Sequence, residues 1–288
     1  ETGRDPSGGL HRAGTRAGHG LMRLTARRRR GLSALKRFMY AQLYLRDAAL
    51  IALGRGKPLL PFRVEATPPS LYLNFAIRPE ALDALERRLD LPLPITEIAC
   101  LEGDEPFACL TLNVYRVSGL ANGIRAEWSV YVTDPDGTPR FLVVEAQTEK
   151  GSLDSVELFT RPGPISYVDT GGELRVEITS TEAGTISLTV PAPEDAPTVR
   201  ATSQWVEAND YIYWRNGICD RTFYDAGLAN PRIRRLDPAA ATILDTTAWA
   251  SVVDPVPRSV VVFDDAIEFA ISPWWNVGDP ASVPGIRV

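Results

Sequence analysis

Histidine is almost absent from this chain of 288 residues, and its two copies, His11 and His19, lie near the beginning. The rest of the chain therefore cannot contain a Ser-His-Asp triad or a histidine-ligated metal site. Cysteine is also scarce, and Cys100, Cys109 and Cys219 have no zinc-like spacing and are too few for a disulfide scaffold. We expect Cys100 and Cys109 to be buried as small apolar residues, and the two could face each other across a hairpin.

Long apolar runs are missing as well. No stretch reaches the roughly 18 uninterrupted apolar residues that indicate a transmembrane helix. The composition, with 44% hydrophobic and 23% charged residues, is that of an ordinary globular protein. The length suits one large domain or two small ones. The low and odd number of cysteines favours a reducing compartment, the cytoplasm or an organelle matrix.

Acidic residues are scarce at the start of the chain, and basic residues are outnumbered in the rest of it. Residues 1–57 contain 13 Lys/Arg against 3 Asp/Glu, a balance of +10, and the remainder contains 18 against 33, a balance of −15. Phosphate contacts need clustered cations, so the acidic part is a poor nucleic-acid surface and we expect no nucleic-acid partner. The sequence thus predicts two parts, a basic arm over residues 1–57 and an acidic domain over residues 58–288.

The arm has two segments. Residues 1–31 are rich in Gly, Arg and Ala and are typical of a flexible tail or of a targeting remnant. Residues 32–53 predict an amphipathic helix, because apolar side chains recur at steps of three and four. This helix either packs on its own domain or docks on a protein partner, on another copy of the chain, or on an anionic membrane surface, which would place the protein at the membrane periphery.

The pattern after the arm is mainly β. Four prolines in residues 58–69 predict an extended linker, and residues 79–91 predict a short helix with Pro79 in its first turn. The other segments read as short strands at about ten-residue spacing, joined by hairpin turns, and include residues 70–78, 92–102 and 107–117. The fold class is therefore mainly β (α+β), an antiparallel barrel or sandwich with an N-terminal helical arm.

Several of these segments, in this order, resemble the acetoacetate decarboxylase superfamily. The resemblance covers roughly residues 65–275 and is carried by "LYLNFAIRPEALDALERRLDLPLP", "YRVSGLANGIRAEWSVYV", "TPRFLVVEAQTE" and the region from "YIYWRNGICDRTF" to "VVVFDDAIEF". It implies a cone-like antiparallel β-barrel whose interior holds a small keto acid. It also implies a lysine that condenses with the substrate ketone, beside a second lysine that lowers its pKa.

The sequence departs from the family at this lysine pair. The paired lysines would fall near Ser152 and Leu153, where the chain reads "GSL", and Lys150, the only lysine after Lys57, lies about two residues earlier. Lys150 is a displaced Schiff-base lysine, a non-covalent anion ligand, or a surface residue at a strand end, and we expect the last. The family's cavity glutamate would fall near Arg125, and Glu127 could replace it on the same strand face.

Other polar residues on the predicted strands are candidates for the same site. Glu127 and Glu145 are candidate acid/base groups and Lys150 a candidate nucleophile. An arginine fork matches the two oxygens of a carboxylate. The candidate ligand-binding residues are Arg78, Arg116, Arg125, Gln147, Tyr213 and Arg215.

Two functions fit these residues. We expect a barrel without Schiff-base decarboxylase activity that binds a small keto acid or other carboxylate, or that serves as an accessory subunit docked through residues 1–57. The alternative is a lyase, of decarboxylase, aldolase or dehydratase type, that uses Lys150. Neither function calls for a cofactor or a metal.

Overall fold

The structure is a computed structural model. It describes Gln42, Leu45, Arg46 and Ala49, and then residues 62–89, 91, 93–119, 122–133, 137–150, 162–179, 184–215, 219–223 and 232–271. The chain divides into two compact units, Glu1–Leu60 and Pro61–Val288.

Only four residues of the first unit are described. Gln42, Leu45, Arg46 and Ala49 are helical and exposed, and they fall inside the predicted helix of residues 32–53. The basic tail and the apolar residues of that helix lie outside the described residues, so the docking role of the arm stays a prediction. Among the helices that the structure describes, none is long and apolar enough to cross a membrane.

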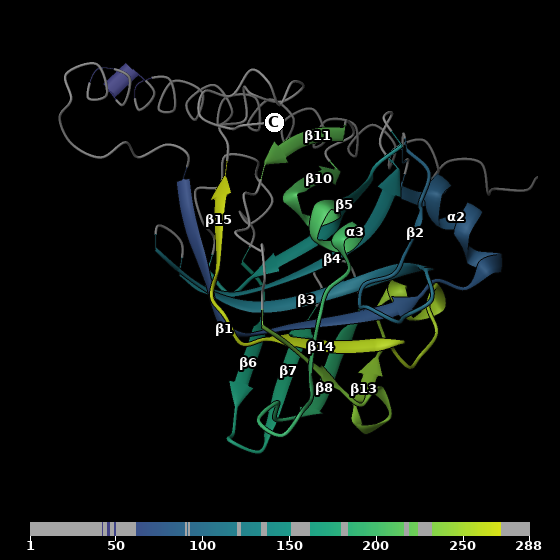
Figure 1. Cartoon of the computed structure of the whole chain (residues 1–288), viewed down its shortest axis with the longest axis vertical. Coiled ribbons are helices and arrows are strands. Elements are labelled where there is room, and N and C mark those ends of the chain that lie inside the picture. Colours follow the sequence, from purple (N-terminus) through teal and green to yellow (C-terminus); the bar gives the residue numbers. More distant parts are fainter. Residues whose placement is uncertain are drawn as a thin grey trace, which may run out of the picture. The chain divides into compact units, whose positions relative to one another are not determined.

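The second unit is built mainly of strands, as the sequence predicts (Figure 1). Two α-helices and two short 3-10 helices interrupt them. In chain order the elements are β1 (Phe62–Ala76), α2 (Pro79–Leu89), β2 (Glu97–Ile98), β3 (Phe107–Gly119), β4 (Gly123–Thr133), β5 (Pro139–Thr148), β6 (Ile165–Asp169), β7 (Glu173–Thr179), β8 (Thr185–Pro191), β9 (Thr198–Val199), α3 (Ser203–Asp210), β10 (Tyr211–Arg215), β11 (Cys219–Phe223), β12 (Ile233–Leu236), η1 (Pro238–Ala240), β13 (Thr242–Asp245), η2 (Ala248–Ser251), β14 (Ser259–Phe263) and β15 (Ile267–Ile271).

The strands form two sheets. The large sheet has the order β11-β10-β5-β4-β3-β1-β14-β12-β9, with β15 also paired to β1 and β2 to β3, and the small sheet has the order β13-β8-β7-β6. All ladders are antiparallel except β10 with β5, which is parallel. Within the described strands the large sheet stays open, since β11 and β9 end it without pairing to each other. The predicted antiparallel β class is confirmed, and the arrangement is a curved sheet with a second sheet against one face rather than a closed barrel.

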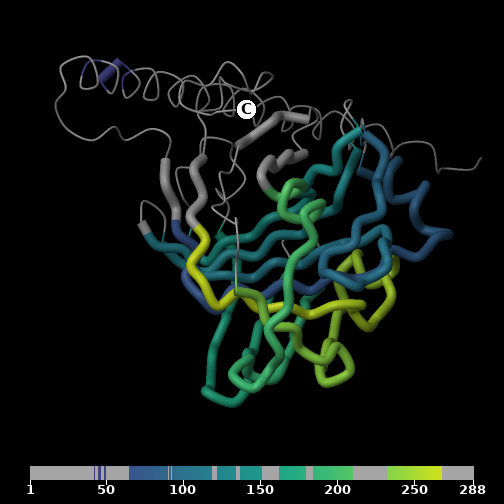
Figure 2. Tube along the Cα trace, viewed as in Figure 1, coloured from purple at the N-terminus to yellow at the C-terminus, as the bar shows by residue number. Residues whose placement is uncertain are grey.

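Strand β1 corrects the prediction of a linker over residues 58–69. It starts at Phe62 and pairs first with β15 and then with β14, so that the first described strand of this unit lies beside its last described strand (Figure 2). Its register with β3 shifts between Thr67 and Leu71, and this irregularity is where Pro68 and Pro69 fall. Proline is tolerated in a sheet at such points because no ladder hydrogen bond is lost there.

Two neighbouring predictions have different outcomes. The predicted helix over residues 79–91 is confirmed as α2, which begins at Pro79 and buries Leu85 and Leu89. The predicted strand over residues 92–102 is wrong for most of its length, because only Glu97–Ile98 pair with β3. Isolated bridges join the rest of the described segment to other parts of the chain, Ile95 to Val132 at the end of β4 and Leu101 to Ala201.

The apolar core lies between the two sheets. Alternate residues of β1, β3 and β4 are buried there, and they meet the alternating buried residues of β7 and β8. Trp128 on β4 packs on Trp249 of η2, with 5.9 Å between ring centroids. A second apolar cluster, which includes Tyr131, Trp205 and Phe263, lies against the opposite face of the large sheet.

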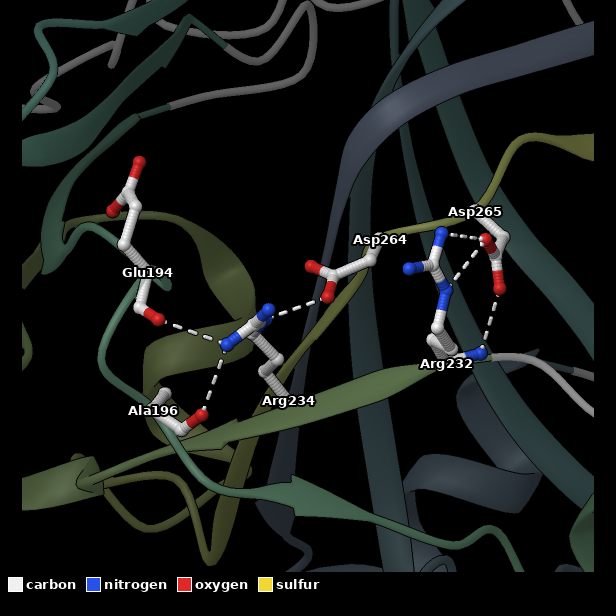
Figure 3. A network of polar contacts seen from close by, with 6 residues as sticks. All are labelled: Glu194, Ala196, Arg232, Arg234, Asp264 and Asp265. Atoms are coloured by element: carbon white, nitrogen blue, oxygen red, sulfur yellow. Dashed lines mark hydrogen bonds and ion pairs between the residues drawn. The ribbon is translucent and has the colours of Figure 1, made fainter.

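Ion pairs fasten the edge of the large sheet at β12 (Figure 3). Arg234 Nε lies 2.6 Å from Asp264 Oδ2, and Arg232 Nη2 lies 2.6 Å from Asp265 Oδ1. The Arg234 guanidinium also donates to the carbonyl oxygens of Glu194 and Ala196, at 2.9 and 3.2 Å. These contacts tie β12 to the turn after β14 and to the segment before β9. The arginines around β12 and the aspartates after β14 thus have a structural role as ion-pair partners.

Candidate functional site

Polar side chains occupy the centre of the large sheet, on the face opposite the apolar core. Side chains alternate between faces along a strand, so one set of alternate residues of β1, β3 and β4 points to this side. We call this set the polar face. Its nine residues are Ser70, Tyr72, Asn74, Thr111, Asn113, Tyr115, Arg125, Glu127 and Ser129, and all nine are buried.

The strand registers bring these residues together. Asn113 of β3 lies opposite Tyr72 of β1 on one side and opposite Glu127 of β4 on the other. Two further cross-strand rows flank this one. In the first, Tyr115 of β3 lies opposite Arg125 of β4. In the second, Thr111 of β3 lies between Asn74 of β1 and Ser129 of β4. Directly opposite residues have Cβ atoms about 4.5–5.5 Å apart, so the nine side chains form one contiguous patch.

Glu127 is the acidic residue of the polar face. Its side chain is buried, with 4% exposure, and its Oε1 accepts a hydrogen bond from the Tyr115 hydroxyl. Burial and, secondarily, the negative charge of Glu127 raise the pKa of Tyr72 well above its usual range. The Glu127 carboxylate therefore accepts from the Tyr115 hydroxyl and lies near that of Tyr72.

Arg125 is the basic residue of the polar face. It precedes Glu127 by two residues on β4, so both side chains lie on the same side of the sheet, and it is 3% exposed. It lies opposite Tyr115 on β3 and Thr148 on β5. A guanidinium has several N–H donors in a planar fork and can serve more than one acceptor, including a carboxylate in bidentate fashion.

One edge of the polar face is a satisfied hydrogen-bond chain. Thr111 Oγ1 donates to Asn74 Oδ1 at 2.7 Å, and Asn74 Nδ2 donates to Ser259 Oγ at 2.8 Å. Thr111 Oγ1 also lies 3.8 Å from Cys109 Sγ. Asn74, Thr111 and Ser259 therefore satisfy one another at this edge of the patch.

Beyond that edge the two predicted neighbours, Cys100 and Cys109, lie together. Both are buried free thiols, as the sequence predicts. A hydrogen bond to Cys109 and then burial raise the pKa of Cys100 well above its usual range. Cys100 thus stays protonated at neutral pH, and the burial of both thiols fits a packing role.

Helix α3 covers part of the polar face and was missed from the sequence. Thr202 Oγ1 caps its first turn by accepting from the Trp205 backbone N–H at 3.0 Å. Trp205 is 1% exposed, its Nε1 donates to the Tyr131 hydroxyl at 2.5 Å, and its ring contacts Tyr72 at a centroid distance of 5.9 Å. The helix therefore shields the tyrosine side of the patch from water.

Two predicted site residues lie on the opposite side of the sheet. Glu145 is opposite Trp128 and accepts from Trp249 Nε1 at 2.7 Å, within the apolar core region. Gln147 Nε2 donates to the carbonyl oxygens of Pro164 and Thr179, at 2.9 and 2.8 Å, and so links β5 to the small sheet. The contact of Glu145 joins β5 to η2 and those of Gln147 join β5 to the small sheet, and both side chains point away from the face of Glu127.

The other predicted residues are dispersed. Arg78 donates to the Ser251 carbonyl at 3.3 Å, and its Nε lies 3.8 Å from Asp254 Oδ1. Arg116 donates to the Tyr167 carbonyl, and its Cζ lies 5.7 Å from the centroid of that ring. These arginines therefore have structural partners outside the polar face.

Lys150 is exposed and lies two residues after Thr148, the last residue of β5. This is the strand-end surface position that we expect from the sequence. Tyr213 and Arg215 belong to β10, and their side chains lie outside the described residues. Of the predicted set, the structure brings Arg125 and Glu127 together on the polar face.

Sequence reasoning missed most of the polar face, although a signal exists. In β1, β3 and β4 every second residue is polar, as in Tyr72 and Asn74 or Asn113 and Tyr115, while the intervening residues are large and apolar. Such alternation usually indicates a solvated face. Here helix α3 and neighbouring strands cover that face, so its polar side chains are buried.

Comparisons with known proteins find similar solved structures but no matching family model. The sequence matches no protein-family model and no curated protein. A crystal structure of acetoacetate decarboxylase from Legionella pneumophila subsp. pneumophila str. Philadelphia 1 is similar, with a TM-score of 0.46, 10% identity, and coverage of 73% of this chain and 84% of that one. Another acetoacetate decarboxylase structure has a TM-score of 0.48, 12% identity, and coverage of 75% and 90%. An acetoacetate decarboxylase-like enzyme from Sphingomonas wittichii RW1 has a TM-score of 0.43, 12% identity, and coverage of 73% and 89%.

Proposed function

We propose that the polar face binds a small carboxylate without covalent chemistry. The observation that carries this proposal is the buried pair of Arg125 and Glu127 on one strand face, surrounded by tyrosine, serine and asparagine side chains. A buried guanidinium is costly unless acceptors surround it. An arginine fork that is already desolvated binds a carboxylate more strongly than one in water.

The neighbours of Arg125 suit a small anion. Glu127 receives the Tyr115 hydroxyl, so part of its charge is stabilised within the protein. The ligand carboxylate is then placed on the Arg125 side, away from the Glu127 oxygen that Tyr115 occupies. Because the patch is buried beneath α3, the ligand must be small and largely desolvated.

Iminium chemistry is not part of this proposal. A Schiff-base lysine must be neutral near pH 7, which requires an apolar site or a nearby cation, and the exposed Lys150 has solvent around it instead. Lys150 also follows β5 at its end, whereas Glu127 lies in the middle of β4. The amine and the candidate acid/base group are therefore not arranged for a shared reaction.

Calorimetric titration with pyruvate and with lactate tests the proposal. We expect Arg125→Lys, which keeps the charge but loses the fork, to weaken binding at least about tenfold, or ~1.4 kcal/mol. Lys150→Ala is the matched control, and its affinities should equal those of the wild type. If Arg125→Lys binds as well as the wild type, or if no carboxylate binds to a folded wild-type protein, the polar face is not a carboxylate site.

Borohydride reduction in the presence of pyruvate tests the lyase alternative directly. We expect the intact mass of the protein to remain unchanged, because the exposed Lys150 lacks the apolar cavity and the neighbouring cation that activate a Schiff-base lysine. A covalent pyruvyl adduct that disappears in Lys150→Ala would instead establish the lysine as a nucleophile.

A further inference from the structure

Three uncharged side chains of the polar face have polar atoms that meet no hydrogen-bond partner in the described part of the chain. These atoms are Ser70 Oγ, Asn113 Oδ1 and Ser129 Oγ. The residues are 0%, 2% and 0% exposed, so bulk water does not reach them either. Buried polar atoms in folded proteins are almost always paired, so three exceptions on one sheet face call for a missing partner.

The three residues lie along one diagonal of the patch. Asn113 is central, since it is opposite both Tyr72 and Glu127. Ser70 precedes Tyr72 by two residues, and Ser129 follows Glu127 by two, so each serine is on the same face as its strand neighbour. In the antiparallel registers these offsets place the serines at opposite corners with Asn113 between them. Diagonal neighbours are about 7–8 Å apart, within the span of one small ligand.

The chemistry of the three atoms selects the ligand group. Asn113 Oδ1 only accepts and therefore needs a donor, which neither a carboxylate nor a ketone oxygen supplies. The serine hydroxyls both donate and accept. A hydroxyl group meets all of these needs, and because it both donates and accepts it also suits either orientation of the Asn113 amide.

We infer that the ligand is a hydroxy acid, with its hydroxyl group on Asn113 and Ser129 and its carboxylate on Arg125. This inference rests on the proposed carboxylate binding and adds the group that determines specificity. Asn113 is opposite Glu127, and Arg125 and Ser129 flank Glu127 on β4. At about 3.3 Å per residue the Arg125 and Ser129 backbones are about 13 Å apart, so the long Arg125 side chain has to extend past Glu127 to meet a short ligand held at Asn113 and Ser129. A ligand without the hydroxyl leaves Asn113 Oδ1 buried and unpaired.

Calorimetry with three acids of equal carbon number tests the inference. Wild-type protein should bind lactate at least about tenfold more tightly than propionate or pyruvate, which lack a hydroxyl donor. Asn113→Leu and Ser129→Ala should each bring the ratio of lactate affinity to propionate affinity close to one. Ser187→Ala, at an exposed serine of the small sheet, is the control and should keep the full preference.

The outcomes separate the two proposals. Equal affinities for lactate and propionate in the wild type would overturn the hydroxyl inference and leave the Arg125 site standing. Binding of none of the three acids would overturn the carboxylate proposal and this inference with it. A lactate preference that survives in both folded variants would show that other residues recognise the hydroxyl. Ser129→Ala removes only one unpaired atom, so it should stay folded even if Asn113→Leu does not.

Discussion

The free energy of unfolding is expected to hold steady up to about pH 8.5 and then to fall steeply, by about 5 kcal/mol per pH unit above pH 10.5. Burial raises the pKa values of Tyr72, Tyr131 and Tyr167, and a hydrogen bond to Cys109 together with burial raises that of Cys100. In the unfolded chain the thiol titrates near ~8.5 and the phenols near ~10. The unfolded state therefore loses these protons first.

The sign follows from this order of titration. Between the unfolded and the folded pKa of each group, the native state binds one more proton than the unfolded state, so rising pH favours unfolding. Each group contributes about 1.4 kcal/mol per pH unit in that range, and the four groups act together above the ordinary tyrosine value. Below the unfolded values the full stability remains, which sets the plateau at neutral pH.

Urea unfolding at intervals between pH 7 and pH 11.5 measures the profile. Tyr72→Phe is the informative variant, because it removes one of the titrating groups and should make the alkaline slope shallower by about 1.4 kcal/mol per pH unit. A wild-type profile that stays flat through pH 11.5 would mean that these phenols are accessible to solvent, and the buried polar face would not exist as described.

Replacement of Trp205 by alanine should lower the free energy of unfolding by about 3–5 kcal/mol at pH 7. The side chain is 1% exposed and contacts Tyr72 and Phe263, at centroid distances of 5.9 and 5.7 Å, in addition to its hydrogen bond to Tyr131. Its loss leaves a large cavity between α3 and the sheet and removes a partner of the Tyr131 hydroxyl. The variant should also lose affinity for the ligand, since the cover of the polar face is loosened.

Val206→Ala is the matched control on the same helix. Val206 is only partly buried, so its truncation should cost about 1 kcal/mol or less. Urea titration followed by circular dichroism compares the two variants. If Trp205→Ala lost no more stability than Val206→Ala, α3 would not cover the sheet in the way the structure places it.

The strands could be predicted because alternation is a local property. Residues 107–117 and 140–149 carry the pattern in their own sequence, and Arg125 and Glu127 share a face by parity alone. Alternation along one strand does not tell which residues of two neighbouring strands lie opposite each other, because that depends on the register of their pairing. The register of β4 with β5 shifts between Trp128 and Ser129, and it places Glu145 opposite Trp128 rather than beside Glu127.

The missed elements have equally physical causes. Helix α3 is eight residues long, too short to form on propensity, and it exists because Trp205 packs on Tyr72 and Phe263. Strand β1 extends through a proline-rich segment because its two halves pair with β15 and β14, which lie near the far end of the domain sequence. Both depend on long-range contacts, as does the burial of Asn113 and Ser129.

The most direct measurement is diffraction from crystals of the protein soaked with lactate. Our account predicts difference density for one lactate on the polar face, with its carboxylate at the Arg125 guanidinium and its hydroxyl within hydrogen-bond distance of Asn113 and Ser129. Lys150 should have no contact with the ligand. Well-ordered water alone on the polar face, with lactate bound at Lys150 or elsewhere, would contradict the account.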